Sequence, residues 1–369
     1  TVMAPANLEA ARAMARKSMV LLKNDNNTLP LDNKKSIALI GPLAADGNQL
    51  IGPWSGAGEG EKCISVLTAF QERAAKNGFT LLSAKGCEIL GKDKSKFAEA
   101  LNAARRSDMI IAVVGESKEM AGEAAARADI SLPGIQEELV EALIATGKPV
   151  VVVLMNGRPL TIPFIAEHAA AIVEAWWLGT EGGHAVADVL YGDYNPSGKL
   201  TMTFPRSLGQ VPIFYSQKNT GRPFNPDSKW NSKYIDLPNS PQFPFGFGLS
   251  YTTFTYDSLI LSKHDYSFTD TITASIRITN SGSRAGEEIV QLYTRDLVGS
   301  VTRPVKELKG FRKIMLEPGA SQTVTFKLTA DDLRFYTASM KFEAEPGLFW
   351  IMAGPDSERL QKREIRLVK

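Results

Sequence analysis

The sequence has few of the residues that build metal sites and disulfide frameworks. It contains two cysteines and three histidines in 369 residues. Cys63 and Cys87 are too few for a disulfide framework or a cysteine-based metal site. Either one bridge in an oxidising compartment or two separate buried thiols is compatible with this count. No apolar run reaches about 18 residues, so no membrane-spanning helix is expected.

An excess of charge of one sign is also absent. The chain has 42 Lys and Arg against 40 Asp and Glu, a formal net charge of +2, and no basic stripe. Nucleic-acid-binding proteins usually concentrate basic residues on one face, so no nucleic acid partner is expected. With 44% hydrophobic and 22% charged residues, the composition is that of a globular protein. The length predicts two or three domains.

The first residues lack an initiator methionine, an apolar leader segment and a cleavage site. Apolar residues at three- and four-residue spacing instead predict a helix over residues 5–23. They are Leu8, Ala11, Ala15, Met19 and Leu22. We interpret residues 1–34 as a helix and lead-in within a longer protein.

Short strands rich in Val and Ile alternate with helices over residues 35–205. Examples are "DMIIAVVG" and "KPVVVVLMNG". Continuous apolar runs are typical of strands buried on both faces, as in a parallel sheet covered by helices. We therefore expect an α/β sandwich, with a mostly parallel sheet and helices on both faces. Such sheets bind ligands at the carboxyl ends of their strands.

The rest of the chain changes character twice. Residues 206–252 are rich in Pro, Asn, Gly, Ser and aromatic residues, which predicts an extended linker. Residues 253–369 show short alternating strands separated by turn residues such as "NSGSRAG" and "LEPG". About seven short strands in this length predict an immunoglobulin- or fibronectin-type β-sandwich.

One acidic loop follows an apolar strand directly. The stretch "GESKEMAGEAAARADISLP" places Glu116, Glu119 and Glu123 beyond Gly115. A carboxylate in such a loop is more often a solvated residue or a helix cap than a catalytic group. Glu123, flanked by Gly122, is nevertheless suited to act as a general acid that reaches over a substrate. Its pKa would then have to be raised by desolvation against the charge of Arg127.

Other motifs carry weaker information. "GPWSGAG" (52–58) lies in a loop after a strand and could reach the same rim of the sheet. Trp54, next to Ser55, is suited to stack on a sugar ring, and a half-buried structural tryptophan is an equally common interpretation. His184 at a helix start is more often structural than catalytic. The glycines of "GAGEG" do not match a dinucleotide motif, and a G-x-S-x-G elbow is absent.

Longer strings resemble one known family. "ARKSMVLLKNDNNTLPL", "IALIGPLA", "VVVLMNGRPL", "WWLGTEGGHAVADVLYGDYNPSGKLTMTFPRSLGQVP" and "FPFGFGLSYTTF" occur in this order. Together they resemble the C-terminal half of family 3 glycoside hydrolases of the periplasmic β-glucosidase type, from about residue 8 to the end. The resemblance implies an α/β sandwich domain and then a fibronectin type III-like domain. It also implies a preceding (β/α)8 barrel, absent here, with the nucleophilic aspartate and most glucose-binding residues.

The same resemblance implies a retaining hydrolysis. An aspartate attacks the anomeric carbon, and a glutamate of the second domain protonates the leaving oxygen, with the carboxyl groups about 5 to 5.5 Å apart. In the family this glutamate often lies in an E-G-x-D-R string. Here "EAAAR" places Glu123 at the acid/base position and Arg127 at the arginine, while Ala124 and Ala126 replace the usual Gly and Asp. Glu116 is the second choice.

The resemblance also implies substrates and partners. Trp54 and Ser55 match a loop on the aglycone side, so with Arg127 they are the expected substrate-binding residues. The expected activity is exo-hydrolysis of terminal β-D-glucosyl residues from oligosaccharides or aryl glucosides, without cofactor or metal. The alternatives are a β-xylosidase or other β-glycosidase of the same family, and a non-catalytic carbohydrate-binding or association module. We expect this chain to be inactive without the barrel.

Assembly and location follow from the same resemblance. The segments 5–23 and 206–250 are the expected contacts with the barrel, and the fibronectin-like domain is expected to be structural. A homodimer is left open. Relatives imply a periplasmic or secreted location. No membrane partner is expected.

Overall fold

The computed structural model describes residues 3–31 and 35–369, and the chain forms two compact units. The first unit holds the chain up to Lys199 together with Phe204–Gly209 and Gly248–Tyr251. The second unit holds Leu200–Thr203, Gln210–Phe247 and Thr252–Lys369. The expected boundaries at 205 and 252 stay predictions, because short segments between them alternate between the units.

The first unit is built on a six-stranded sheet with the order β1-β6-β5-β4-β2-β3. Its strands are β1 (Val20–Asn24), β2 (Ser36–Ile40), β3 (Thr80–Ala84), β4 (Met109–Gly115), β5 (Val150–Met155) and β6 (Ala171–Glu174). All neighbours pair in parallel except β1, which runs antiparallel to β6. The expectation of a mostly parallel sheet is confirmed.

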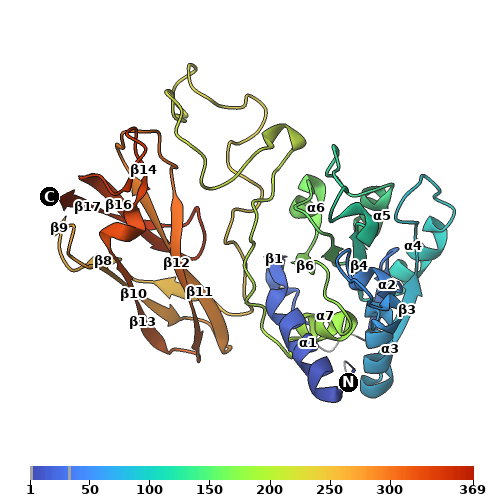
Figure 1. The fold of residues 1–369 in the computed structure, drawn as a ribbon. Coiled ribbons are helices and arrows are strands. Elements are labelled where there is room, and N and C mark those ends of the chain that lie inside the picture. Colours follow the sequence, from blue (N-terminus) through green and yellow to red (C-terminus); the bar gives the residue numbers. More distant parts are fainter. Residues whose placement is uncertain (1–2, 32–34) are drawn as a thin grey trace. The chain divides into compact units, whose positions relative to one another are not determined.

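Helices cover both faces of this sheet (Figure 1). On one side lie α1 (Pro5–Ser18), α3 (Val66–Asn77) and α7 (Gly182–Tyr191). On the other lie α4 (Phe97–Arg105), α5 (Gln136–Ile144) and α6 (Pro163–His168). The short α2 (Gly47–Leu50) follows β2. The predicted α/β sandwich is therefore confirmed.

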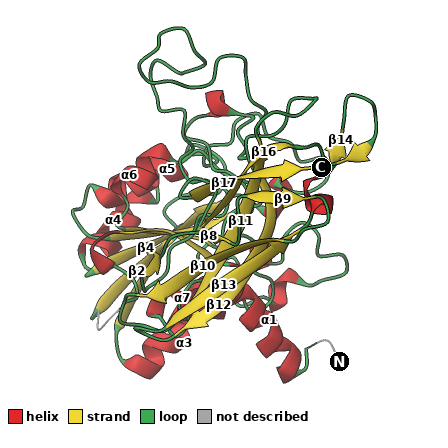
Figure 2. Ribbon diagram, turned by 90° about the vertical axis from the view of Figure 1, so that its left-hand side faces the viewer, coloured by secondary structure: helices red, strands yellow, loops and turns green. Residues whose placement is uncertain are grey.

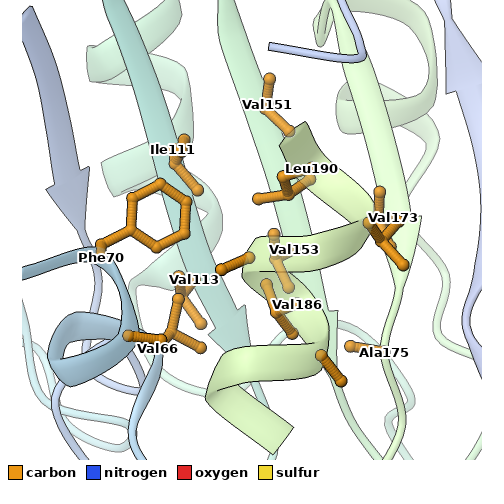
Figure 3. Packing of buried hydrophobic residues seen from close by; sticks show 14 of the residues in the cluster. Val66, Phe70, Ile111, Val113, Val151, Val153, Val173, Ala175, Val186 and Leu190 are labelled. Atoms are coloured by element: carbon orange, nitrogen blue, oxygen red, sulfur yellow. The ribbon is translucent and has the colours of Figure 1, made fainter. Parts of the chain in front are cut away.

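The core of the first unit follows from the strand composition. Successive side chains of a strand point to opposite faces, so a sheet covered twice needs apolar residues at every position. All seven residues of β4 and all six of β5 are buried. Figure 3 shows one face, where α3 and α7 pack onto alternate strand residues. The labelled residues are Val66, Phe70, Ile111, Val113, Val151, Val153, Val173, Ala175, Val186 and Leu190.

The helix predicted over residues 5–23 is too long. The structure ends α1 at Ser18 and continues, after Met19, as the edge strand β1. The apolar spacing fits both elements locally, but Val20 and Leu21 pair with Glu174 and Val173 of β6. Pairing with the sheet outweighs helix propensity here, so part of the expected lead-in belongs to the α/β domain.

The second unit contains a β-sandwich, as expected. One sheet has the order β13-β10-β7, with β8 also paired to β10, and the other has the order β12-β11-β16-β17-β9. The strands are β7 (Phe254–Tyr256), β8 (Ile260–Leu261), β9 (Asp265–Ser267), β10 (Ile272–Asn280), β11 (Gly286–Asp296), β12 (Glu307–Leu316), β13 (Ser321–Leu328), β16 (Gly347–Gly354) and β17 (Gln361–Val368). A small hairpin joins β14 (Phe335–Tyr336) to β15 (Phe342–Glu343).

The stretch expected as a linker has little regular structure. Its one short 3-10 helix is Leu208–Gln210, and residues 211–253, all described, form no helix or strand, which Figure 2 shows as a long loop. Proline and glycine are frequent there, which disfavours ladder formation. Near its end the N–H of Leu249 donates to the carbonyl of Leu21 in β1.

The two cysteines are separate buried thiols. Desolvation raises the pKa of Cys87 to about 11 and also raises the pKa of Cys63. Among the described residues, no helix is long and apolar enough to cross a membrane.

Candidate active-site loop

The candidate site begins where β4 ends. A side chain on Gly115 is excluded, because a Cβ there would lie 1.9 Å from the carbonyl oxygen of Met155 in β5. The buried Gln136 of α5 donates to the Gly115 carbonyl and accepts from its N–H, both at 2.8 Å. The strand end is therefore held tightly at the carboxyl edge of the sheet, where the sequence predicts a binding site.

Glu116 is fully buried and ion-paired. Its Oε1 lies 2.6 Å from Nη1 of Arg127 and 3.0 Å from Nε of Arg158, which follows β5. Its Oε2 accepts from the N–H of Gly157 at 3.2 Å. A carboxylate with no exposed surface and these partners is unsuited to reach a substrate, so the geometry disfavours the second-choice acid.

Glu123 has the opposite environment. It is exposed, and within the described part of the chain no residue forms a hydrogen bond or ion pair with its carboxylate. The backbone on both sides is unusual, since Gly122 has φ +94° and Ala124 has φ +58°. A non-glycine residue at positive φ is strained by about 1 kcal/mol or more. The loop therefore projects Glu123 outward on a bent backbone. Glu119 is exposed too and lies on a 3-10 helix (Lys118–Met120).

The loop with Trp54 reaches the same rim. A Cβ on Gly122 would lie 3.0 Å from Cβ of Pro53 and 3.6 Å from Cε2 of Trp54. The backbone N–H of Lys118 also donates to Oε1 of Gln49 in α2 at 2.8 Å. The Trp54 side chain is 74% exposed, so its ring face is available for stacking. Ser55 is half-buried, and its carbonyl accepts from Gly58 at 2.8 Å.

Two arginines bind the backbone of the acidic loop. Arg158 donates through Nη2 to the carbonyls of Met120 and Ala125, the second at 2.8 Å. Arg127 donates through Nη2 to the carbonyl of Ser131 at 3.0 Å. Arg127 was expected to bind substrate; its contacts here are with the loop and Glu116, and a direct contact with substrate stays a prediction.

Arg158 was missed in the sequence. It lies in "NGRPL" immediately after the Val-rich β5, and a polar residue at the carboxyl end of a central strand is the signal that could have identified it. Its contacts with Glu116 also bear on the charge argument. Glu116 compensates part of the positive charge of Arg127 and Arg158.

A second buried glutamate lies at the end of β6. Glu174 accepts from the Trp176 N–H at 3.0 Å and from Asn156 Nδ2 at 3.1 Å. Desolvation raises the pKa of Glu174 well above its usual value, and the charge of Glu116 adds to this, while the two hydrogen bonds lower it. This environment favours the neutral carboxylic acid and makes Glu174 a structural group beneath the rim.

The described residues contain no group of three or more His, Cys, Asp or Glu side chains that could hold a metal ion. His184 is bound between Glu181, at 2.6 Å, and Glu72, at 2.9 Å. These contacts fit the structural role expected for it. The rim of the sheet therefore carries an exposed carboxylate, Glu123, close to an exposed tryptophan, Trp54.

Comparison with known proteins identifies the family. The model of the glycosyl hydrolase family 3 C-terminal domain matches residues 19–251, and that of a fibronectin type III-like domain matches residues 288–357. The chain belongs to glycoside hydrolase family 3. The resemblance inferred from the sequence strings is therefore confirmed, as is the pairing of an α/β domain with a fibronectin type III-like domain.

Curated relatives of this family 3 chain carry two activities in their names. It is 45% identical to a periplasmic β-glucosidase of Salmonella typhimurium, covering 97% of this chain and 50% of the relative. It is also 45% identical to a β-xylosidase of Formosa agariphila, covering 95% of this chain and 48% of the relative. The chain thus spans about half the length of these relatives.

Solved structures agree with the observed fold. The β-glucosidase of Listeria innocua in complex with glucose superposes with a TM-score of 0.94 at 36% identity, covering 100% of this chain and 51% of that one. A β-glucosidase of Erythrobacter marinus gives a TM-score of 0.90 at 38% identity, covering 99% of this chain.

Proposed function

We propose that this chain is the C-terminal part of a retaining, exo-acting β-glucosidase and supplies its general acid/base, Glu123. The observation that carries the proposal is the contrast between Glu123, exposed and unpaired, and Glu116, buried between two arginines. A general acid must reach the leaving oxygen of a bound substrate, and only the exposed carboxylate of this pair is free to do so.

The nucleophile belongs to the N-terminal half of the longer protein. Retaining hydrolysis needs two carboxyl groups about 5 to 5.5 Å apart, and the relatives are about twice as long as this chain. A nucleophilic aspartate on a (β/α)8 barrel, approached by the Glu123 loop, completes the pair. Without that partner the acid has no covalent intermediate to form, so we expect residues 1–369 alone to be inactive.

Trp54 and Ser55 form the aglycone side of the site in this proposal. Trp54 presents most of its ring to solvent and lies against Gly122, one residue before Glu123. An aromatic face at that position packs on the C–H face of the sugar or aryl group that leaves. Arg127 supports the loop and is the remaining candidate for a polar contact with substrate.

The Pro-rich loop of the second unit is the proposed contact with the barrel. It exposes several large apolar side chains, four of which (Phe214, Phe224, Tyr234 and Ile235) line one hollow. Apolar side chains that gather in this way usually mark interaction sites. The exposed side chains of the loop are Val211, Phe214, Phe224, Trp230, Tyr234 and Ile235. The name of the Salmonella relative supports a periplasmic or secreted location.

The sugar specificity has a second candidate. The β-xylosidase of Formosa agariphila is as similar to this chain as the periplasmic β-glucosidase. Comparing aryl β-glucoside and aryl β-xyloside hydrolysis by the longer protein separates the two. A non-catalytic carbohydrate-binding role predicts saturable cellobiose binding by residues 1–369 alone.

The test of the proposed function is chemical rescue in the longer protein. Glu123→Ala should lose activity steeply on aryl glucosides with poor leaving groups, and azide should restore activity on good ones while forming β-glucosyl azide. Glu119→Ala is the matched control, because Glu119 is an exposed glutamate of the same loop. Equal, small effects of both substitutions would show that Glu123 is not the acid/base.

A further inference from the structure

The backbone around Glu123 is held mainly by side chains. In the segment from Ala121 to Ser131 the structure has no helix or strand. A segment without regular structure needs other partners for its backbone carbonyls, or leaves them to water. Two of these carbonyls, those of Ala125 and Ser131, accept from arginine side chains, and so does the carbonyl of Met120 immediately before the segment. The carbonyl of Ile130 accepts from the backbone N–H of Thr161.

Arg158 binds on both sides of the glutamate. Its Nη2 donates to the carbonyl of Met120, three residues before Glu123, and to that of Ala125, two residues after it. One guanidinium nitrogen therefore joins the two limbs of the loop and closes a small turn that carries Gly122, Glu123 and Ala124. Contacts at both ends of a turn restrict where its central side chain can point.

The guanidinium of Arg158 is ion-paired with the buried Glu116, and its Nε forms no hydrogen bond. Its Nε lies 3.0 Å from Oε1 of Glu116, and the same oxygen lies 2.6 Å from Nη1 of Arg127. Glu116 is anchored in turn by its position after β4 and by the N–H of Gly157. The side chains of Arg127 and Arg158 are 18% and 20% exposed, so both ion pairs are largely shielded from water.

Burying the ion cluster of Glu116, Arg127 and Arg158 costs more free energy than burying apolar side chains of similar size. Burying charges is expensive, and well-packed apolar side chains often replace a buried ion cluster without loss of stability. Such a cluster does supply directed donors at fixed positions. Here the guanidinium groups donate to the backbone carbonyls on either side of the exposed Glu123. An apolar side chain could not donate to these carbonyls.

We propose that Arg158 is a positioning residue for the acid/base, which it orients by joining the two limbs of the Glu123 loop above the buried carboxylate of Glu116. The effect of Arg158 on catalysis rests on the proposed function, in which Glu123 is the acid/base. Arg158 touches no reacting atom; it acts through Glu123. Loss of its two loop contacts lets the carboxylate move away from the leaving oxygen, and a displacement of about 1 Å can cost about 100-fold in rate.

The first test measures the loop itself in residues 1–369. Arg158→Lys keeps the charge near Glu116 but lacks the fork that reaches two carbonyls. Arg158→Lys should lower the free energy needed to open this loop locally. Hydrogen exchange of peptides covering residues 118–131 should therefore be about tenfold faster or more than in the wild type. The control Arg106→Lys, at an exposed arginine after α4, should leave this exchange unchanged. Unchanged exchange in Arg158→Lys would overturn the inference.

The second test measures catalysis in the longer protein. Arg158→Lys should lower kcat for aryl glucosides with poor leaving groups about 10- to 100-fold, with much less effect on good leaving groups and on KM. A general loss of stability would lower all rates together. If all substrates slow equally, or if none does, Arg158 does not position the acid.

The two tests separate failure of this inference from failure of the proposed function. If Glu123→Ala shows no azide rescue but Arg158→Lys loosens the loop, the acid/base assignment is wrong and the structural part of the inference stands. Arg158→Gln serves as the second variant where Arg158→Lys folds poorly, because it removes the guanidinium that reaches both carbonyls, leaves Glu116 paired with Arg127, and should loosen the same peptides.

Discussion

Gly122 packs closely against Pro53, and a side chain at position 122 would require Pro53 to shift by a few tenths of an ångström. A Cβ at Gly122 would lie 3.0 Å from Cβ of Pro53, so two loops nearly 70 residues apart in sequence meet at one rim of the sheet. Through this contact the exposed Trp54 and the exposed Glu123 belong to one surface. The predictions below follow from the contacts around it.

Replacing Ala124 with glycine should stabilise the chain. It adopts φ +58°, where glycine is unstrained, so Ala124→Gly should stabilise residues 1–369 by about 0.5 to 1 kcal/mol after the entropic cost of glycine. Ala126→Gly is the matched control, since Ala126 is exposed and is not among the positive-φ residues; it should be neutral or destabilising. Denaturant unfolding of both variants checks this, and equal effects would show that φ at 124 is not strained.

Glu116 should be essential for the stability of the first unit. Glu116→Ala removes a buried carboxylate and leaves the charges of Arg127 and Arg158 without compensation. A loss of about 3 kcal/mol is expected. The exposed Glu119 provides the comparison, because Glu119→Ala should change the free energy of unfolding by less than about 0.5 kcal/mol. Similar values for both would mean that the Glu116 ion pairs contribute little.

Trp54 should matter for substrate and little for folding. Because the side chain is 74% exposed, Trp54→Ala should alter the free energy of unfolding by less than about 1 kcal/mol. In the longer protein it should raise KM for oligosaccharides with a sugar on the leaving side. Trp177→Ala is the contrast, because the partly buried Trp177 packs against the core cluster beside Gly52 and Gly157. This substitution should cost about 3 kcal/mol. A large loss of stability in Trp54→Ala would assign that ring to the structure instead.

The stability of the first unit should fall as the pH rises above about 6.5. Burial by itself lowers the pKa of His184, but hydrogen bonds to Glu181 and Glu72 outweigh it, and the net pKa is raised. A histidine with a raised folded pKa contributes stability that is complete below the unfolded pKa and is lost through the folded pKa. Thermal unfolding between pH 6 and 9 should therefore depend less on pH in His184→Gln than in the wild type. The exposed His168 supplies a control, His168→Gln, which should retain the wild-type dependence.

Deleting residues 1–23 should destabilise the first unit. The deletion removes α1 and most of β1, whose Val20 and Leu21 pair with β6. It also removes Arg12, which binds the buried Asp188 through Nε at 2.6 Å. A fall in the melting temperature of the deleted chain is therefore expected, and weaker association with the N-terminal half would then reflect lost folding as well as lost contacts. If the melting temperature is unchanged, weaker association of the deleted chain with the N-terminal half would report on lost contacts alone.

The sequence by itself determined the family, the order of the two fold classes and the loop that carries the candidate acid. These features are local: apolar runs, turn residues and long strings such as "FPFGFGLSYTTF" can be recognised without knowing which segments meet. The helix predicted over 5–23 shows the limit of local pattern, because the partner strand β6, about 150 residues away, decides that Val20–Asn24 is a strand.

Only the tertiary structure distinguished the glutamates of the acidic loop. Glu116 and Glu123 follow the same strand, but the sheet order places β5 next to β4, and this brings Arg158 to Glu116. The pairing buries one carboxylate and leaves the other exposed above it. Burial and ion pairing depend on which strand ends are neighbours, and no spacing along the chain encodes that neighbourhood.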